Sequence, residues 1–134
     1  MSVLPASPTD PLVISENASP ADRLAACKSY LQAEMVTLRA RHAAGASGLD
    51  IAHSRARSID RMLKQLFDIA LARYEATNGK APVPVSLLAL GGYGRNELSP
   101  LSDIDVMFLF PTKSKPAAMK EFLEHLTNHI LYPL

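Results

Sequence analysis

The sequence predicts an α+β fold in which N-terminal helices precede the start of a mixed sheet. Two long segments with helical periodicity come first, at about residues 19–41 and 49–77. Two mostly apolar runs of strand length follow at 85–90 and 103–110, and an amphipathic segment comes last. The chain therefore divides into a leader (1–18), a helical segment (19–80) and a part that contains the strands (81–134).

Length and composition limit the function classes. The 134 residues, 48% of them hydrophobic, suit one domain with a core. The balance of 14 basic and 13 acidic residues argues against a general nucleic-acid binder. The single cysteine, Cys27, excludes an internal disulfide and favours a reducing compartment. No signal-peptide pattern is visible and no apolar run could span a bilayer, so we expect a cytoplasmic protein without a membrane partner.

The N-terminal part predicts a flexible leader followed by a helix. Residues 1–18 hold three prolines among polar residues and show no sustained period. Ser19 is a suitable N-cap, Pro20 suits the first helical position, and Asp22 favours the helix dipole. The apolar stripe continues to about Arg41, where the small-residue stretch 43–48 ends it.

The second helix, about 49–77, is predicted to end at Asn78-Gly79. The run 85–90 is predicted to be a strand buried on both faces. One or two helical turns are expected at 93–98, before a second strand at 103–110.

The last helix is expected to open at Ser114 or Lys115, after Pro111 closes the second strand. Its predicted inward side chains recur at helical spacing: Met119, Phe122, Leu123, Leu126 and Ile130.

The stretch "LGGYGRNELSPLSDIDV" at 90–106 holds the candidate site. On a strand, Asp103 and Asp105 would share one face, with their α-carbons about 6.6 Å apart. Two neighbouring carboxylates repel each other unless a cation lies between them, and Mg²⁺ prefers carboxylate and phosphate oxygens. We therefore predict both aspartates as metal ligands. The alternate positions are expected to face the core: Ile104, Val106, Phe108 and Phe110.

The glycines upstream complete this prediction. Gly91 and Gly92 lack side chains, so their backbone can approach a phosphate closely. Arg95 could add a positive fork, and Ser102 could donate to a phosphate or stabilise a turn. A Gly-Gly pair alone is more often only a turn, and a lone Asp-x-Asp is more often a solvated strand end. Both together, in a strand–turn–strand context, are more specific.

Three other features favour ordinary structural roles. His125 and His129 have a spacing that can hold zinc, but no third ligand lies nearby, so a helix surface is the preferred interpretation. Cys27 is expected to pack in the core. The basic run 53–61 could touch RNA or an acidic partner, and is more simply the solvated face of a helix.

The string "LALGGYGRNELSPLSDIDVMFLF" resembles the nucleotidyltransferase superfamily that includes DNA polymerase β. Its motif looks specifically like that of the bacterial PII-protein uridylyltransferases, the nitrogen sensors, which carry Gly-Gly-Tyr-Gly-Arg-Gly-Glu-Leu before Ser-Asp-Ile-Asp. The segment 45–67 also resembles that family, and the resemblance covers roughly residues 20–134. One departure is Asn96, where the family usually has glycine. Asparagine tolerates a positive φ better than most residues do.

The resemblance implies transfer of UMP from UTP to a tyrosine of the PII signalling protein. Asp103 and Asp105 would then hold Mg²⁺ catalytically, and Gly91 and Gly92 would seat the β- and γ-phosphates. Residues 81–134 would be a partial nucleotidyltransferase core, truncated and with little activity alone. Two alternatives remain open: another acceptor (an antibiotic, a tRNA end or glutamine synthetase), or a non-catalytic nucleotide-binding or interaction module.

Overall fold

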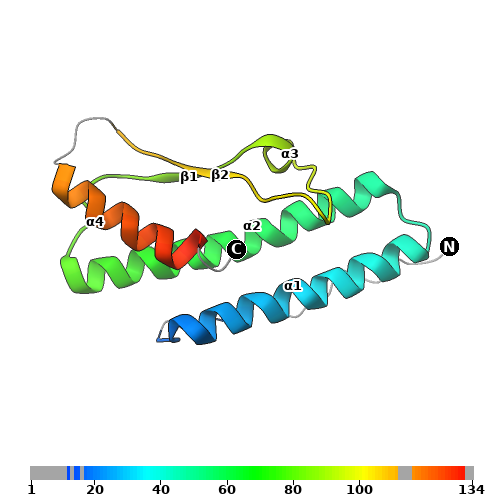
Figure 1. The fold of residues 1–134 in the computed structure, drawn as a ribbon, viewed down its shortest axis with the longest axis horizontal. Helices are drawn as coiled ribbons and strands as arrows, with labels where there is room; N and C mark the ends of the chain where they lie inside the picture. Colours follow the sequence, from blue (N-terminus) through cyan, green and yellow to red (C-terminus); the bar gives the residue numbers. More distant parts are fainter. Residues whose placement is uncertain (1–11, 13, 16, 112–115, 132–134) are drawn as a thin grey trace.

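The computed structural model describes residues 12, 14, 15, 17–111 and 116–131. The longest helix, α2 (Gly48–Asn78), lies in the middle, with α1 (Pro20–Ala43) along one side and the strands along the other (Figure 1). The remaining elements are β1 (Ser86–Ala89), α3 (Gly91–Gly94), β2 (Val106–Leu109), α4 (Pro116–Leu126) and a terminal π-helical turn, η1 (Thr127–Leu131). The α+β prediction is confirmed. Among the described residues, no helix is both long and apolar enough to cross a membrane.

Local signals set the ends of the two long helices. The Ser19 hydroxyl accepts the Asp22 amide at 3.1 Å, and Pro20 opens the helix as predicted. The second helix has an equivalent N-cap in Ser47, whose hydroxyl accepts the Asp50 amide at 3.1 Å. It ends at Gly79, whose φ of 77° only glycine adopts readily. Both helices match their predicted extents within two residues.

The two strands form an antiparallel pair and are shorter than predicted. Ser86 lies opposite Leu109 and Ala89 opposite Val106. The Leu90 amide donates to the Asp105 carbonyl at 2.9 Å, so the register continues one pair beyond β1. Asp103 and Asp105 therefore lie in the extended chain just before β2 rather than inside the predicted strand 103–110.

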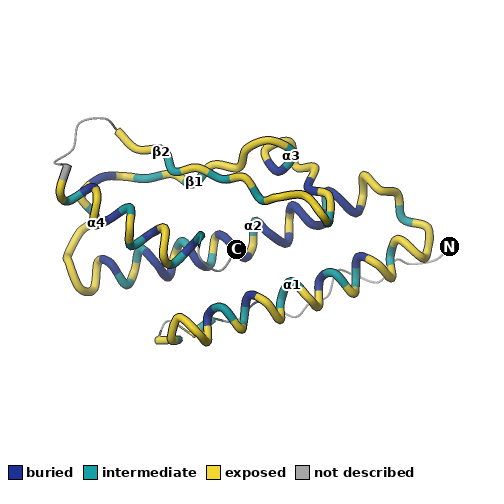
Figure 2. The backbone as a smooth tube through the Cα atoms, in the orientation of Figure 1, coloured by how far each residue is buried: buried dark blue, intermediate teal, exposed yellow. Residues whose placement is uncertain are grey.

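The prediction that 85–90 is buried on both faces is wrong. Leu87 is half-buried against the core, but Leu88 and Leu90 are 37% and 38% exposed. The described helices cover only one face of the strand pair, and the tube in Figure 2 is mostly exposed along it. Phe110, predicted to face inward, is 37% exposed and lies beyond the end of β2. Ile104, Val106 and Phe108 do pack against the core.

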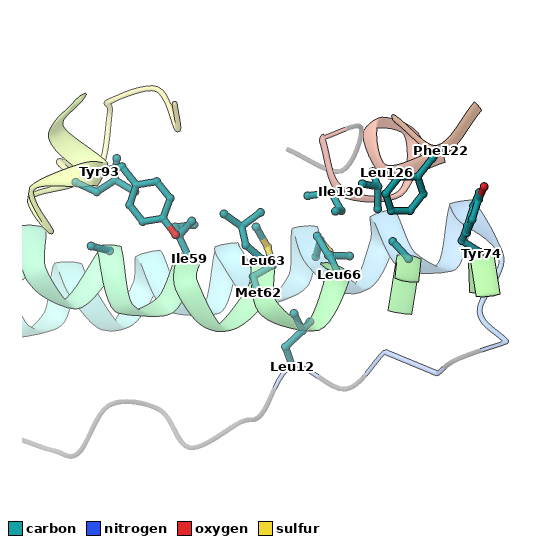
Figure 3. Packing of buried hydrophobic residues seen from close by; sticks show 14 of the residues in the cluster. Leu12, Ile59, Met62, Leu63, Leu66, Tyr74, Tyr93, Phe122, Leu126 and Ile130 are labelled. Atoms are coloured by element: carbon teal, nitrogen blue, oxygen red, sulfur yellow. The ribbon is translucent and has the colours of Figure 1, made fainter. Parts of the chain in front are cut away.

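The core follows one side of α2 (Figure 3). Side chains from α2 meet Tyr93 near one end and the last helix near the other. Of the predicted inward residues of that helix, Leu123 is half-buried and the rest are buried. Cys27 is fully buried, as predicted. The largest fully buried side chains are Ile59, Met62, Leu66, Leu98, Phe122, Leu126 and Ile130.

The described end of the predicted leader contacts the helices. Leu12 is buried within the core cluster. The Ala18 carbonyl accepts Nη2 of Arg73 at 2.7 Å and Nη1 of Arg23 at 3.4 Å. The prediction of flexibility for residues 1–11, 13 and 16 lies outside the described residues.

The interface between α1 and α2 contains buried charge. Nη1 of Arg55 lies 3.8 Å from Oε2 of Glu34, and both side chains are largely buried. The Tyr30 hydroxyl donates to the Ser58 carbonyl at 2.9 Å. The prediction that 53–61 is a solvated face is therefore wrong for Arg55 and Ser58, because these positions point toward α1. Arg57 is exposed, as expected.

Glu34 gives the fold a testable pH dependence. Burial raises the pKa of its carboxyl above the ordinary 4.5, and the charge of Arg55 only partly opposes this shift. A carboxyl whose pKa is higher in the folded state than in the unfolded state stabilises the fold at pH values below its unfolded-state pKa. This stabilisation is lost as the pH rises through the folded-state pKa. Glu34→Gln should therefore be at least as stable as the parent at pH 7, and its advantage should shrink toward pH 4.5.

Urea unfolding of the parent and the variant at several pH values measures this difference. Glu75→Gln, at an exposed position of α2, is the matched control for a glutamate-to-glutamine change. A Glu34→Gln protein that is clearly less stable at pH 7 would mean that attraction to Arg55 outweighs the cost of burial.

Candidate functional site

An open hollow of about 700 Å³ lies between the start of α2 and the chain that follows α3. Asp103, Asp105, Gly92, Arg95 and Ser102 all line it, so the structure brings five of the six predicted site residues together. The sixth, Gly91, lies directly beside Asp105. The other lining residues are Gly48, Leu49, Ala52, Tyr93, Glu97, Leu98, Ser99 and Leu101.

The strand register brings the glycine turn next to a carboxylate. Leu90 pairs with Asp105, and the turn that starts directly after Leu90 brings Gly91 beside the Asp105 side chain. A Cβ built on Gly91 would lie 3.4 Å from Oδ2 of Asp105, and the φ of Gly91 is +58°. A side chain at position 91 would therefore strain the backbone, and its Cβ would be in van der Waals contact with the carboxylate.

The other glycines of α3 meet backbone atoms. A Cβ on Gly92 would lie 2.9 Å from the Glu97 carbonyl oxygen, and a Cβ on Gly94 would lie 2.8 Å from that of Ala89. Both contacts are closer than a Cβ tolerates, so the turn itself requires these glycines. The sequence prediction favoured ligand approach for Gly92 and gave a structural turn as the alternative, and this contact supports the structural role. The helical turn also occupies Gly91–Gly94, where 93–98 was predicted.

Asn96 and Arg95 shape the chain after the turn. Asn96 has a φ of 60°, which confirms that this position needs a residue that tolerates the left-handed region. The Arg95 side chain is 69% exposed, and its Nε lies 4.0 Å from Oε2 of Glu97. Such an exposed pair holds the guanidinium only weakly, so Arg95 can reorient toward an anion in the hollow.

The two aspartates point away from the core. Asp103 and Asp105 are exposed while Ile104 and Val106 are half-buried, so the predicted alternation holds. Ser102 is exposed, and its amide donates to the Ser99 carbonyl at 2.9 Å in a turn. Two exposed carboxylates beside a hollow suit a hard cation that completes its coordination with water and phosphate oxygens. Across the described ranges, no group of three metal-ligating side chains occurs.

Helix α2 forms the opposite wall of the hollow, and sequence reasoning missed it. Gly48, Leu49 and Ala52 line that wall. The Leu98 amide donates to the Ala52 carbonyl at 3.2 Å, which ties the motif to the helix. These small or apolar residues lie about forty positions before the glycine turn in the sequence, and their side chains have no functional groups that would indicate a site.

The histidine pair is more constrained than the predicted helix surface. Nε2 of His125 lies 2.7 Å from the Ala70 carbonyl oxygen, and Nδ1 of His129 lies 2.9 Å from that of His125. Their rings stack at 4.0 Å, and both residues are half-buried. Burial lowers the pKa of His129, and neighbouring positive groups lower it further. The pair lies outside the hollow.

Comparison with known proteins extends these observations. The profile of the DUF294 nucleotidyltransferase family matches residues 32–134. A curated protein of Caulobacter vibrioides, named bifunctional uridylyltransferase/uridylyl-removing enzyme, is 36% identical over 91 residues, which are 67% of this chain and 9% of that protein. A protein of the same name from Methylococcus capsulatus is 33% identical over 102 residues, 76% of this chain and 11% of its own length.

Another such protein, from a Psychrobacter species, is 45% identical over 67 residues, 48% of this chain and 7% of its own length. The chain thus spans about a tenth of the length of the curated relatives it matches. No solved structure matches it significantly.

Proposed function

The chain belongs to the DUF294 nucleotidyltransferase family, and from that premise we propose that it supplies the metal- and triphosphate-binding half of a uridylyl-transfer site. One observation carries the proposal: the Asp105 carboxylate lies against the Gly91 backbone in the wall of a hollow that Asp103 also lines. A carboxylate pair and a side-chain-free turn are the two parts that a metal-bound triphosphate needs.

The donor set fits Mg²⁺ because both exposed carboxylates offer hard oxygen ligands. Asp103 and Asp105 would hold the metal, which when bound supplies charge neutralisation at the phosphates and a lowered pKa for the attacking hydroxyl. The Gly91-Gly92 backbone lets the β- and γ-phosphates approach without steric hindrance. Arg95 is free to pair with a phosphate, and the Ser102 hydroxyl can donate to one.

The donor and acceptor are proposed from similarity. The names of the relatives specify uridylyl transfer, which favours UTP as the nucleotide. The motif resembles that of the PII-modifying enzymes, which favours a tyrosine of PII as the acceptor and a role in nitrogen regulation. A non-catalytic nucleotide-binding module is the second candidate. It is favoured by a sheet that has only two strands in the described part of the chain, where no three acidic, histidine or cysteine side chains group together to hold a metal.

We expect the isolated 134-residue chain to bind UTP weakly, only with Mg²⁺, and to transfer no uridylyl group. Transfer requires the nucleophile to be aligned with the phosphorus, and the hollow is open to solvent, so we expect its described residues not to hold an acceptor in place. Calorimetric titration of UTP with Mg²⁺ or with EDTA tests binding. Mass spectrometry of PII after incubation with the chain and Mg-UTP tests transfer.

Equal UTP affinity in EDTA, or no affinity in either condition, would contradict the binding proposal. An Asp105-dependent uridylyl adduct on PII at catalytic chain concentration would show that the chain suffices for transfer. It would also exclude the non-catalytic module.

A further inference from the structure

Tyr93 is the only residue of α3 with a side chain beyond hydrogen, since α3 reads Gly-Gly-Tyr-Gly. Its ring is 6% exposed and extends from the glycine turn to α2, where it lies near Ile59 (Figure 3). Successive residues of a helix are rotated by about 100°. Tyr93 and Gly91 therefore lie on different sides of the turn, and the Tyr93 side chain reaches α2.

The hydroxyl of Tyr93 has a defined partner. It donates to Oδ1 of Asp60, on α2, at 2.5 Å. Burial raises the pKa of the Tyr93 phenol, and the Asp60 carboxylate raises it further, so the hydroxyl keeps its proton and stays a donor at neutral pH. A hydrogen bond to a carboxylate is among the stronger ones in proteins. Packing alone would need only a phenylalanine here, so the hydroxyl has a role beyond filling space.

The turn is attached to α2 at two points. Tyr93 binds Asp60, and the Leu98 amide binds the Ala52 carbonyl two helical turns earlier on α2. Between these attachments the chain includes Arg95 and Glu97, which line the hollow. By contrast, the strand ladder fixes Asp105 through its bond with Leu90. The strand pairing holds the start of the turn, at Leu90, against Asp105, and the contacts with α2 hold the rest of the turn. The placement of the whole turn relative to the carboxylate therefore depends on both.

We propose that the Tyr93–Asp60 hydrogen bond is a positioning contact, which holds the glycine turn where its backbone and the Asp105 carboxylate can meet the same metal-bound triphosphate. Tyr93 lines the hollow, but its hydroxyl binds Asp60, which does not line it, so the hydrogen bond itself lies outside the hollow. The contact acts on the triphosphate through the turn, while metal affinity depends on the aspartates. The inference rests on the proposed function, since it assigns the turn to triphosphate binding.

Three variants test this contact. Tyr93→Phe removes only the hydroxyl, Asp60→Leu removes the acceptor, and Asp60→Asn keeps an acceptor oxygen and should rescue part of the loss. The matched control is Tyr30→Phe, because the Tyr30 hydroxyl also donates to α2, at the Ser58 carbonyl, away from the hollow. All four are compared with the parent at a temperature at which circular dichroism shows every protein to be folded.

Two affinities separate positioning from general damage. We expect Tyr93→Phe and Asp60→Leu to weaken Mg-UTP binding about tenfold, the loss typical for a hydrogen bond to a charged group. Affinity for Mn²⁺ alone, measured by electron paramagnetic resonance, should stay unchanged because the aspartates are not displaced. Tyr30→Phe should alter neither value. Hydrogen exchange at the Gly94, Arg95 and Glu97 amides, which are bonded within the turn, should accelerate only in the Tyr93 and Asp60 variants.

The outcomes are distinguishable. Unchanged Mg-UTP affinity and unchanged exchange in Tyr93→Phe would overturn the positioning contact. Equal losses of Mn²⁺ and Mg-UTP affinity would also overturn it, because they indicate general damage. A parent that binds no Mg-UTP would refute the proposed function. In that case, the hydrogen-exchange rates of the turn amides alone decide whether the Tyr93 hydroxyl holds the turn in place.

Discussion

Changing Asp103 and Asp105 together to asparagine is expected to lower Mg-UTP affinity by at least about a hundredfold. Substitution of residues that only hydrogen-bond to metal ligands commonly lowers metal affinity about 10- to 100-fold. Loss of both carboxylate ligands should therefore lower the affinity at least as much. Both side chains are exposed. The substitution should therefore leave the free energy of unfolding nearly unchanged, and removing two neighbouring like charges should not destabilise the fold.

Glu97→Gln is the matched control, since Glu97 is another exposed acid that lines the same hollow. It should keep most of the affinity, because its carboxylate lies near the Arg95 guanidinium rather than beside Gly91. Calorimetry gives the affinities and urea unfolding gives the stabilities. If the double variant binds Mg-UTP as tightly as the parent, the metal assignment is wrong.

Gly92→Val should both abolish triphosphate binding and destabilise the fold by about 1–3 kcal/mol, the usual cost of overpacking. A Cβ at this position would lie 2.9 Å from the Glu97 carbonyl oxygen. The backbone at Glu97 is held in place, because the Glu97 amide donates to the Gly92 carbonyl at 2.9 Å. The turn must therefore open to admit the side chain, and Tyr93 and Leu98 on either side are buried.

Gly48→Ala provides the comparison. Gly48 lines the same hollow, but a Cβ there would meet no atom within 4 Å. This variant should be as stable as the parent or slightly more stable, because alanine restricts the unfolded chain. Thermal unfolding of both variants checks the contrast. A Gly92→Val protein with the stability of the parent would mean that position 92 is open, and that the glycine serves ligand approach alone.

The features predicted well from the sequence are those set by neighbouring residues. Ser19 caps its helix through a bond three residues along the chain, and Gly79 ends the next helix through its own backbone angle. The left-handed conformation of Asn96 is equally local. The closeness of Gly91 and Asp105 also followed from short spacing, because one antiparallel pairing brings them together. The chemical roles of these two residues remain predictions.

The errors concern contacts between distant segments. Periodicity placed Arg55 on a helix and did not show that Glu34 of another helix would cover it. The apolar character of Leu88 suggested burial, but burial depends on whether something packs on that face of the sheet. The α2 wall of the hollow likewise arises only when the chain folds back. Side-chain chemistry marked the polar half of the candidate site and gave no sign of the apolar half.

The buried charges between the two long helices have a consequence for how the molecule opens. The buried residues of α1 are Arg23, Cys27, Glu34 and Leu38, and two of these are charged. Separating α1 from α2 exposes the apolar side chains of α1 but also returns two buried charges to water, so it costs less than disrupting the core around α2. The only thiol of the chain, at Cys27, is shielded in the closed form. Its reactivity toward an alkylating reagent thus reports the partial opening of α1 while the rest of the protein stays folded.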